Sequence, residues 1–240
     1  MKDKAGSSRQ RLQEAAKALF AERGYEHTTV AAIVKLAKTS YSQFIVHFGD
    51  KSGVLSAIFL QAWGEIISTI RLATSRTSSP VGKLNLIVDV LLSYLERDQA
   101  FRTLLLMERA TTRDGNTVLP NAGLSDFMKI LDEVFEDMVR TGELSRGVPP
   151  QLLRSALVGA LEGMLRDQFF RAQTASGIPY SESAVRAVFG TFLESFLQPT
   201  QRAEVQDEFP EGAVDIEIDR DWIHHYLRLA AVALERPGNA

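Results

Sequence analysis

Residues 11–33 read RLQEAAKALFAERGYEHTTVAAI, a segment with the pattern of two short helices joined by a tight turn. Its apolar residues fall on one face of a helix expected over residues 8–23, and Gly24 follows where a left-handed residue commonly ends a helix. Thr28 or Thr29 can then cap a second helix that continues to Ala37. The segment therefore predicts a small helical unit near the N-terminus.

Residues 37–55 read AKTSYSQFIVHFGDKSGVL and add a third helix to this unit. Ser40 and Gln43 have the spacing of a capping box, and the helix that they open ends near His47. Asp50 can cap a fourth helix that begins at Lys51. Two short helices joined by a turn and braced by another form a helix-turn-helix, whose second helix can enter the major groove of DNA.

The chain beyond Lys51 alternates long amphipathic stretches with short breaks, which predicts an all-α fold. We expect an N-terminal three-helix helix-turn-helix domain at 1–50, a larger helical ligand-binding and dimerisation domain at 51–200, and a C-terminal extension at 201–240. Helices are expected at about 81–97, 99–110, 121–141, 149–174 and 180–197. Residues 214–218 alternate as in a strand, and Asp219 can cap a terminal helix.

Composition limits the classes of function. The chain has no cysteine, so disulfides and thiolate metal sites are excluded. Residues 1–52 carry nine Lys or Arg against five Asp or Glu, whereas the remainder carries 18 against 25. This basic head on an acidic body is typical of a small nucleic-acid-binding module, although chance clustering produces the same balance. The chain has no apolar signal core and no apolar run near the ~20 residues that span a bilayer, which predicts a cytoplasmic protein without a membrane partner.

The first 55 residues resemble the TetR family of transcriptional repressors in the order and spacing of many positions. The resemblance implies operator DNA as a partner, a homodimer, and a small-molecule effector bound between helices of the larger domain. The matching positions are Ala16, Phe20, Gly24, Tyr25, Thr28, Thr29, Ile33, Ser40, His47, Phe48 and Lys51.

The chain departs from the family pattern at several positions. Lys38 replaces the glycine of the turn, which predicts a strained or shifted turn. Ile45 replaces a tyrosine that commonly contacts phosphate, so a phosphate donor is lost. Residues predicted to contact DNA share a place near the turn, the recognition helix or the start of the next helix. They are Thr28, Lys38, Thr39, Ser40, Tyr41, Ser42, Gln43, His47 and Lys51.

Large, adaptable side chains on the central helices are candidates for the lining of an effector pocket. They are Trp63, Phe101, Met107, Phe127, Met128, Phe135, Met164 and Gln168. Polar groups that could orient a ligand include Glu162 and Arg166. The same Met and Phe residues are also compatible with an ordinary core, so both interpretations stay open. A pocket lined in this way favours a largely apolar effector.

Two further features concern assembly. Residues 152–165 carry small residues that allow close helix approach, including Ala156, Gly159 and Gly163, and residues 184–197 add an apolar face. These segments predict a dimer seam, with intrachain packing as the alternative.

The sequence bears on three classes of function. No nucleophile elbow, phosphate-binding glycine loop or zinc-protease motif is present, so we predict no enzyme and no cofactor. The sequence favours a ligand-responsive, sequence-specific DNA-binding regulator, and the family resemblance implies a repressor. The alternative is a helical ligand-binding or protein-interaction module whose head does not bind DNA.

Overall fold

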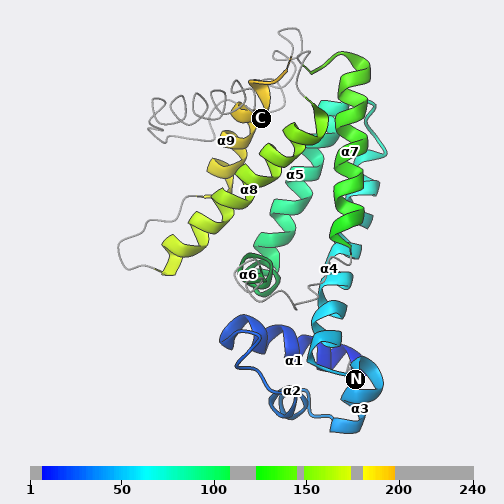
Figure 1. The fold of residues 1–240 in the computed structure, drawn as a ribbon, viewed down its shortest axis with the longest axis vertical. Helices are drawn as coiled ribbons and strands as arrows, with labels where there is room; N and C mark the ends of the chain where they lie inside the picture. Colours follow the sequence, from blue (N-terminus) through cyan, green and yellow to red (C-terminus); the bar gives the residue numbers. More distant parts are fainter. Residues whose placement is uncertain (1–6, 109–122, 145–148, 174–180, 198–240) are drawn as a thin grey trace, which may run out of the picture. The chain divides into compact units, whose positions relative to one another are not determined.

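The computed structural model describes residues 7–108, 123–144, 149–173 and 181–197. Within these ranges the regular elements are α-helices, and one isolated antiparallel bridge joins Leu144 to Leu197. The all-α prediction is confirmed (Figure 1). The strand-like segment predicted at 214–218 and the terminal helix predicted from Asp219 lie outside the described residues.

Three helices form the N-terminal head, each beginning at a hydroxyl side chain. Ser7, Thr29 and Ser40 each accept a hydrogen bond from the backbone N–H three residues further on. Such caps satisfy N–H groups that have no partner within the helix. Thr29, and not Thr28, fills the second cap. The helices are α1 (Ser8–Arg23), α2 (Val30–Leu36) and α3 (Tyr41–Phe48).

The head has its own apolar core. Leu12 and Phe20 from α1, Ile33 from α2 and Phe44 from α3 are all fully buried. Because these four side chains come from three helices, they fix the orientation of α3 relative to α1 and α2.

The turn between α2 and α3 is built around Lys38, which has a φ of 50°. Its N–H bonds to Lys35 O at 3.3 Å, and Thr39 N–H bonds to Val34 O at 3.1 Å. This is the Schellman pattern, in which the left-handed residue is usually glycine. The backbone agrees with the prediction of a strained turn, because Lys38 adopts a left-handed conformation that disfavours side chains.

Helix α4 (Lys51–Thr74) links the head to the rest of the chain. Asp50 caps it by accepting from Gly53 N–H at 2.8 Å. By length and composition alone, α4 is long and apolar enough to cross a membrane. It packs, however, against α1, α3, α5 and α7. These contacts account for its apolar residues as the core of a folded domain.

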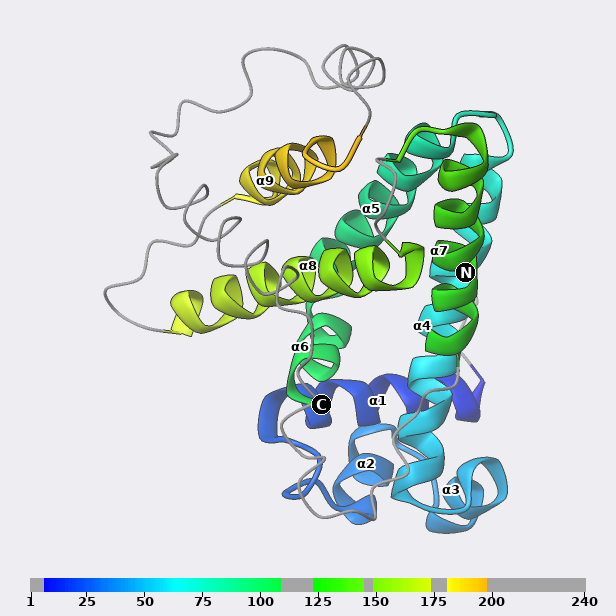
Figure 2. The same ribbon diagram turned by 45° about the horizontal axis from the view of Figure 1, so that its top comes forward.

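The larger domain surrounds α5, which contacts α4, α6, α7 and α9 (Figures 1 and 2). Helix α8 in turn contacts α6, α7 and α9. Most of the predicted helices appear within a few residues of their expected ends. They are α5 (Pro80–Arg97), α6 (Gln99–Glu108), α7 (Leu124–Thr141), α8 (Pro150–Gln173) and α9 (Glu182–Glu194).

Polar contacts tie these helices together. Arg154 on α8 donates to both oxygens of Asp132 on α7 at 2.7 Å. Arg186 on α9 pairs with Asp89 on α5. The buried Glu143 carboxylate accepts from Val81 N–H at 3.2 Å, which satisfies a donor at the start of α5.

Candidate DNA-binding head and effector cavity

The outward face of α3 presents the side chains of its first turn. Tyr41 is 59% exposed, and Ser42 and Gln43 are exposed beside it. Phe44 points the other way, into the core of the head. This arrangement is what a recognition helix requires, because side chains near its N-terminus must reach base edges.

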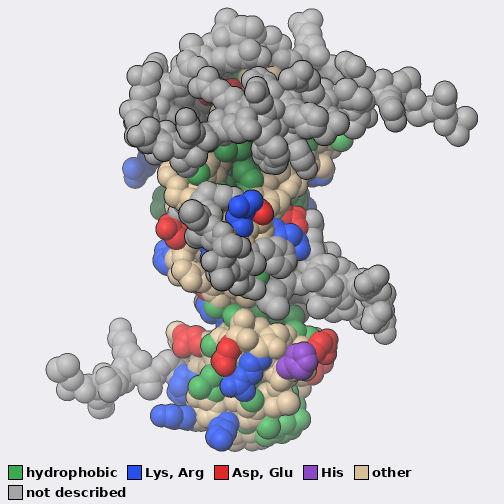
Figure 3. All heavy atoms as spheres, turned by 90° about the vertical axis from the view of Figure 1, so that its left-hand side faces the viewer, with side chains coloured by type: hydrophobic (Ala, Val, Ile, Leu, Met, Phe, Trp, Pro, Cys, Tyr) green, Lys and Arg blue, Asp and Glu red, His purple; other side chains and the backbone are tan. Residues whose placement is uncertain are grey.

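Positive charge lies close to this face. Lys38 is exposed on the turn before α3, and Lys35 is exposed on the last turn of α2. The lower end of the molecule in Figure 3, which is the head, carries Lys and Arg side chains beside apolar ones. Phosphates of a DNA backbone would meet favourable charge at this end.

Thr28 is a correction to the predicted DNA-contacting set. Its side chain is buried, and its hydroxyl donates to Gly24 O at 2.8 Å and lies 3.2 Å from Leu19 O. A hydroxyl engaged in this way holds the α1–α2 connection and is not available to DNA.

Two other predicted contacts, Lys51 and His47, are engaged within the protein, and a third, Thr39, is buried. Lys51 Nζ donates to Tyr25 O at 2.7 Å and lies 4.2 Å from the centre of the Tyr25 ring. His47 Nε2 lies 2.8 Å from Ser8 Oγ. Thr39 Oγ1 is buried, with no hydrogen-bond partner in the part of the chain that the structure describes. The side chains of Lys51 and His47 brace the head, and a DNA contact from Lys51, His47 or Thr39 stays a prediction.

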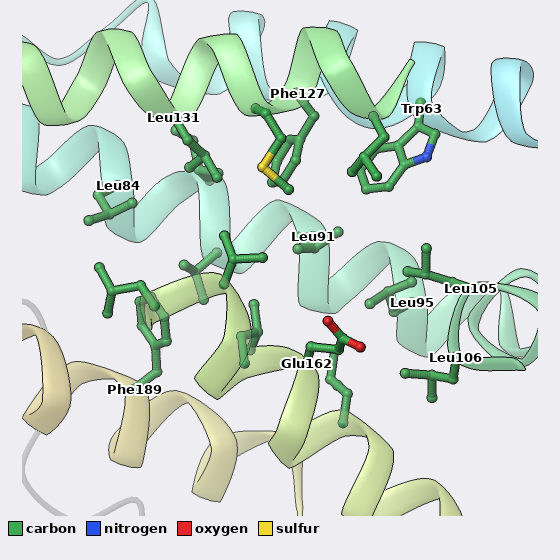
Figure 4. Close-up of a pocket in the computed structure, with 18 of the residues that line it drawn as sticks. Trp63, Leu84, Leu91, Leu95, Leu105, Leu106, Phe127, Leu131, Glu162 and Phe189 are labelled. Atoms are coloured by element: carbon green, nitrogen blue, oxygen red, sulfur yellow. The ribbon is translucent and has the colours of Figure 1, made fainter. Parts of the chain in front are cut away.

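The larger domain contains a cavity with a volume of about 120 Å³ (Figure 4). Side chains from α4 to α9 line it, and ten of the nineteen lining residues are leucine. A space with such walls favours apolar ligand atoms over water.

Four of the eight side chains predicted to bind a ligand line this cavity: Trp63, Phe127, Met128 and Phe135. Three others do not line it, and a ligand contact from any of them stays a prediction. Phe101 packs behind the wall, with its ring edge-on to Trp63 at 6.2 Å. Met164 and Gln168 are on α8 but outside the lining. The side chain of Met107 lies outside the described residues.

Sequence reasoning missed most of the wall. The lining residues that it did not single out share a position on the inner faces of α5 to α9. They are Leu84, Ile87, Val88, Leu91, Leu95, Leu105, Leu106, Leu124, Leu131, Leu157, Val158, Leu161, Leu165 and Phe189. Their heptad-like spacing marks buried helix faces, but it does not distinguish a packed face from one that borders a space.

Glu162 is the ionisable side chain in the described lining. Figure 4 shows its carboxylate directed from α8 toward the space beside Leu91 and Leu95. Its carboxylate also accepts from Arg166 at 2.8 Å, one helical turn away. The predicted polar residue Glu162 therefore supplies a polar point in an otherwise apolar wall.

A short series of contacts connects the cavity wall with the head. Trp63 packs on Phe101, whose backbone N–H bonds to Asp98 Oδ1 at 3.0 Å. The other oxygen of Asp98 accepts from Lys17 Nζ on α1 at 2.6 Å. Thus α6 and α4 both join the cavity to α1.

Comparison with known families agrees with this division of the chain. Residues 12–58 match the family profile described as "Bacterial regulatory proteins, tetR family", and residues 59–173 match "YsiA-like protein, C-terminal region". Together the two matches cover more than half of the chain. The chain belongs to the TetR family. As a TetR-family protein it is a ligand-responsive, DNA-binding transcriptional regulator, and the non-binding alternative is not favoured.

Two regulators are similar in sequence. The fatty acid metabolism regulator protein of Bacillus subtilis is 25% identical over 152 residues, which are 62% of this chain and 77% of that protein. The HTH-type transcriptional repressor AcnR of Corynebacterium glutamicum is 26% identical over 167 residues, covering 68% and 82%. Both relatives are named as regulators.

The TetR fold is also evident in solved structures. The transcriptional regulator FadR from Bacillus subtilis, in complex with stearoyl-CoA, superposes with a TM-score of 0.66 at 22% identity. The superposition covers 77% of this chain and 95% of that one. At this identity the likeness supports the fold.

TetR-family proteins act as dimers, and α8 offers a suitable surface. Leu152, Ala156, Gly159 and Gly163 are exposed along one stripe of this helix. A Cβ added at Gly159 or Gly163 would meet nothing within 4 Å. The small side chains predicted for the seam therefore face outward, where a second copy can approach closely.

Proposed function

We propose that this TetR-family protein is a cytoplasmic repressor that leaves a near-palindromic operator when a fatty-acyl effector occupies the cavity of its larger domain. We infer the class of effector from the cavity wall, which is rich in leucine and has Glu162 as its ionisable group in the described lining. The B. subtilis relatives, one named for fatty acid metabolism and one solved with stearoyl-CoA, support the same class. We also propose that the chain has no enzymatic activity.

In this proposal the DNA contacts come mainly from the turn and the first turn of α3. Gln43 can make two hydrogen bonds to adenine, and Tyr41 and Ser42 can reach a base or phosphate. Lys38 places its charge near the DNA backbone. Ser40 keeps a structural role, because its hydroxyl accepts from Gln43 N–H at 3.3 Å and so holds the first turn.

An acyl thioester suits the cavity better than a free fatty acid. The hydrocarbon chain would replace water along the leucine wall, which is favourable for apolar surface. A free carboxylate beside Glu162 would add a second negative charge in a poorly solvated space. A thioester places no charge at that point.

Release from DNA follows from a shift between two arrangements of the dimer. An effector that binds one arrangement more tightly raises its population, and only this difference in affinity produces the change. Two routes lead to the head, through α4 and through the contacts of Asp98 with Lys17. A change in the distance between the two α3 helices then prevents them from entering successive major grooves.

The decisive experiment selects bound sequences from random DNA duplexes and then titrates the complex with palmitoyl-CoA, palmitate or CoA. We expect a near-palindromic operator and release by palmitoyl-CoA. Release by palmitate alone would assign the site to free fatty acids. No release by either acyl compound would reject the effector class, and failure to recover any sequence would reject operator binding.

A matched pair of variants on α7 tests whether the effector occupies this cavity. Met128→Trp fills space at the wall, whereas Val139→Trp changes a side chain that is 49% exposed. We expect Met128→Trp to need about tenfold more palmitoyl-CoA, because overpacking a site costs on the order of 1–3 kcal/mol. Val139→Trp should respond as the unmodified protein does. Equal responses of both variants would place the effector elsewhere.

A further inference from the structure

The second turn of α3 exposes two aliphatic side chains. Val46 is 80% exposed and Ile45 is 42% exposed. No Lys, Arg, Asp or Glu occurs between Tyr41 and Phe48. In the second turn the half-buried His47 ring is engaged with Ser8, so the exposed side chains Ile45 and Val46 offer only methyl groups.

These two side chains share faces with the first turn. Ile45 lies one helical turn after Tyr41, and Val46 lies one turn after Ser42, because residues four apart are neighbours on a helix. The exposed apolar surface therefore continues directly from the side chains proposed to reach the bases. Removing this apolar surface from water would be favourable, so a partner that covers it gains affinity.

The charge around this surface indicates what covers it. Lys35 and Lys38 are exposed next to α3, and Arg9 stacks 5.4 Å from the centre of the Phe48 ring. An apolar protein surface would gain nothing from these cations, whereas a DNA duplex brings phosphates to them and apolar groups to α3. The apolar groups that duplex DNA exposes in the major groove are the C5-methyl groups of thymine.

We propose that Ile45 and Val46 determine operator specificity by packing against thymine C5-methyl groups in each half-site. This inference rests on the proposed operator binding and adds to it the chemical group that is recognised. Neither side chain can donate a hydrogen bond to phosphate, so their contribution is to sequence preference. Contact between apolar groups discriminates thymine from cytosine, which presents a hydrogen there.

The test replaces each thymine of the selected operator, one at a time, with deoxyuridine. This change removes the methyl group and keeps the base pair and phosphates. We expect one or two positions per half-site where the Kd rises about three- to fivefold, in proportion to one buried methyl group. Ile45→Ala and Val46→Ala should lose this sensitivity, each at its own position, as in a double-mutant cycle.

Controls separate the possible results. Leu72→Ala removes an apolar side chain on α4 that is 69% exposed, between the values of Ile45 and Val46, and should keep the full uracil sensitivity. Val46→Thr preserves the shape of the side chain. It checks that the loss of uracil sensitivity in Val46→Ala does not reflect misfolding. Uniform binding to all uracil-substituted operators, or sensitivity that persists in both alanine variants, would overturn the inference while leaving operator binding intact. Failure of the unmodified protein to bind the thymine operator would instead reject the proposed function.

Discussion

Lys17 and Asp98 form an ion pair of 2.6 Å that joins the head to the start of α6. The same carboxylate caps α6 through Phe101 N–H at 3.0 Å. The two oxygens of the Asp98 carboxylate therefore hold α6 and α1 in place, one oxygen for each helix. Because Phe101 packs on the cavity residue Trp63, movement of the wall reaches this carboxylate directly.

Asp98→Asn is predicted to weaken the coupling between effector and DNA. An asparagine can still cap α6, but it cannot form the ion pair with Lys17. The ratio of operator affinities without and with effector should fall about three- to tenfold, within the usual range for such couplings. Fluorescence anisotropy of labelled operator measures both affinities. Glu22→Gln, which breaks an exposed pair with Arg23, is the control, and equal ratios in both variants would contradict the prediction.

Lys38→Gly is predicted to relieve the turn while weakening DNA binding. The left-handed φ of 50° suits glycine, so the free energy of unfolding should change by less than about 1 kcal/mol in either direction. Loss of the charge should lower the slope of log Kd against log salt concentration by about one, the value for one phosphate contact. Lys38→Asn, which also tolerates this conformation, should give the same slope. An unchanged slope in both variants would exclude Lys38 from the DNA interface.

Gly123→Ala is predicted to destabilise the larger domain. A Cβ at this position would lie 2.4 Å from the Cβ of Trp63, and the φ of +90° is itself unfavourable for alanine. We expect a loss of about 1–3 kcal/mol in urea denaturation. Gly64→Ala, on the same helix as Trp63 but with nothing within 4 Å, should instead gain up to about 1 kcal/mol. Similar effects of both changes would contradict the packing described for Gly123.

Tyr94 is predicted to make the protein less stable at alkaline pH. Burial, reinforced by the Glu65 carboxylate, raises the pKa of this phenol above its ordinary value of 10.0. The unfolded chain therefore releases this proton first, so stability falls as the pH rises above about 10 and is fully present below it. Tyr94→Phe should reduce that fall in chemical denaturation between about pH 9 and 11. Tyr41→Phe, at an exposed site, serves as the control, and parallel pH curves for both variants would oppose the prediction.

Local signals in the sequence were sufficient for the ends of most helices. Ser40 and Asp50 cap the helices that were predicted for them, because a cap depends on groups within four residues. Gly142 likewise ends α7 in the left-handed conformation. The choice between Thr28 and Thr29 depended on tertiary contact: the hydroxyl of Thr28 lies within reach of Leu19 O in the preceding helix, and no local pattern reveals this.

The effector cavity was only partly predictable for a similar reason. Trp63 and Phe127 stood out by size, and both line the space, with ring centres 5.1 Å apart. Phe101 is equally large but lies behind Trp63. Whether an apolar side chain borders a void or another side chain is decided by how several helices meet, and a single helix pattern carries no information about that.

The leucine-rich wall has a consequence for selectivity. Each leucine can change rotamer, and the ten of them come from four different helices, so the space adjusts in small steps. In a wall that adjusts, one methylene more or less is worth only about 0.8 kcal/mol, its free energy of burial. Effectors that differ by two carbons should consequently differ gradually in potency, and the regulator would report the average length of the acyl pool and not the presence of one compound.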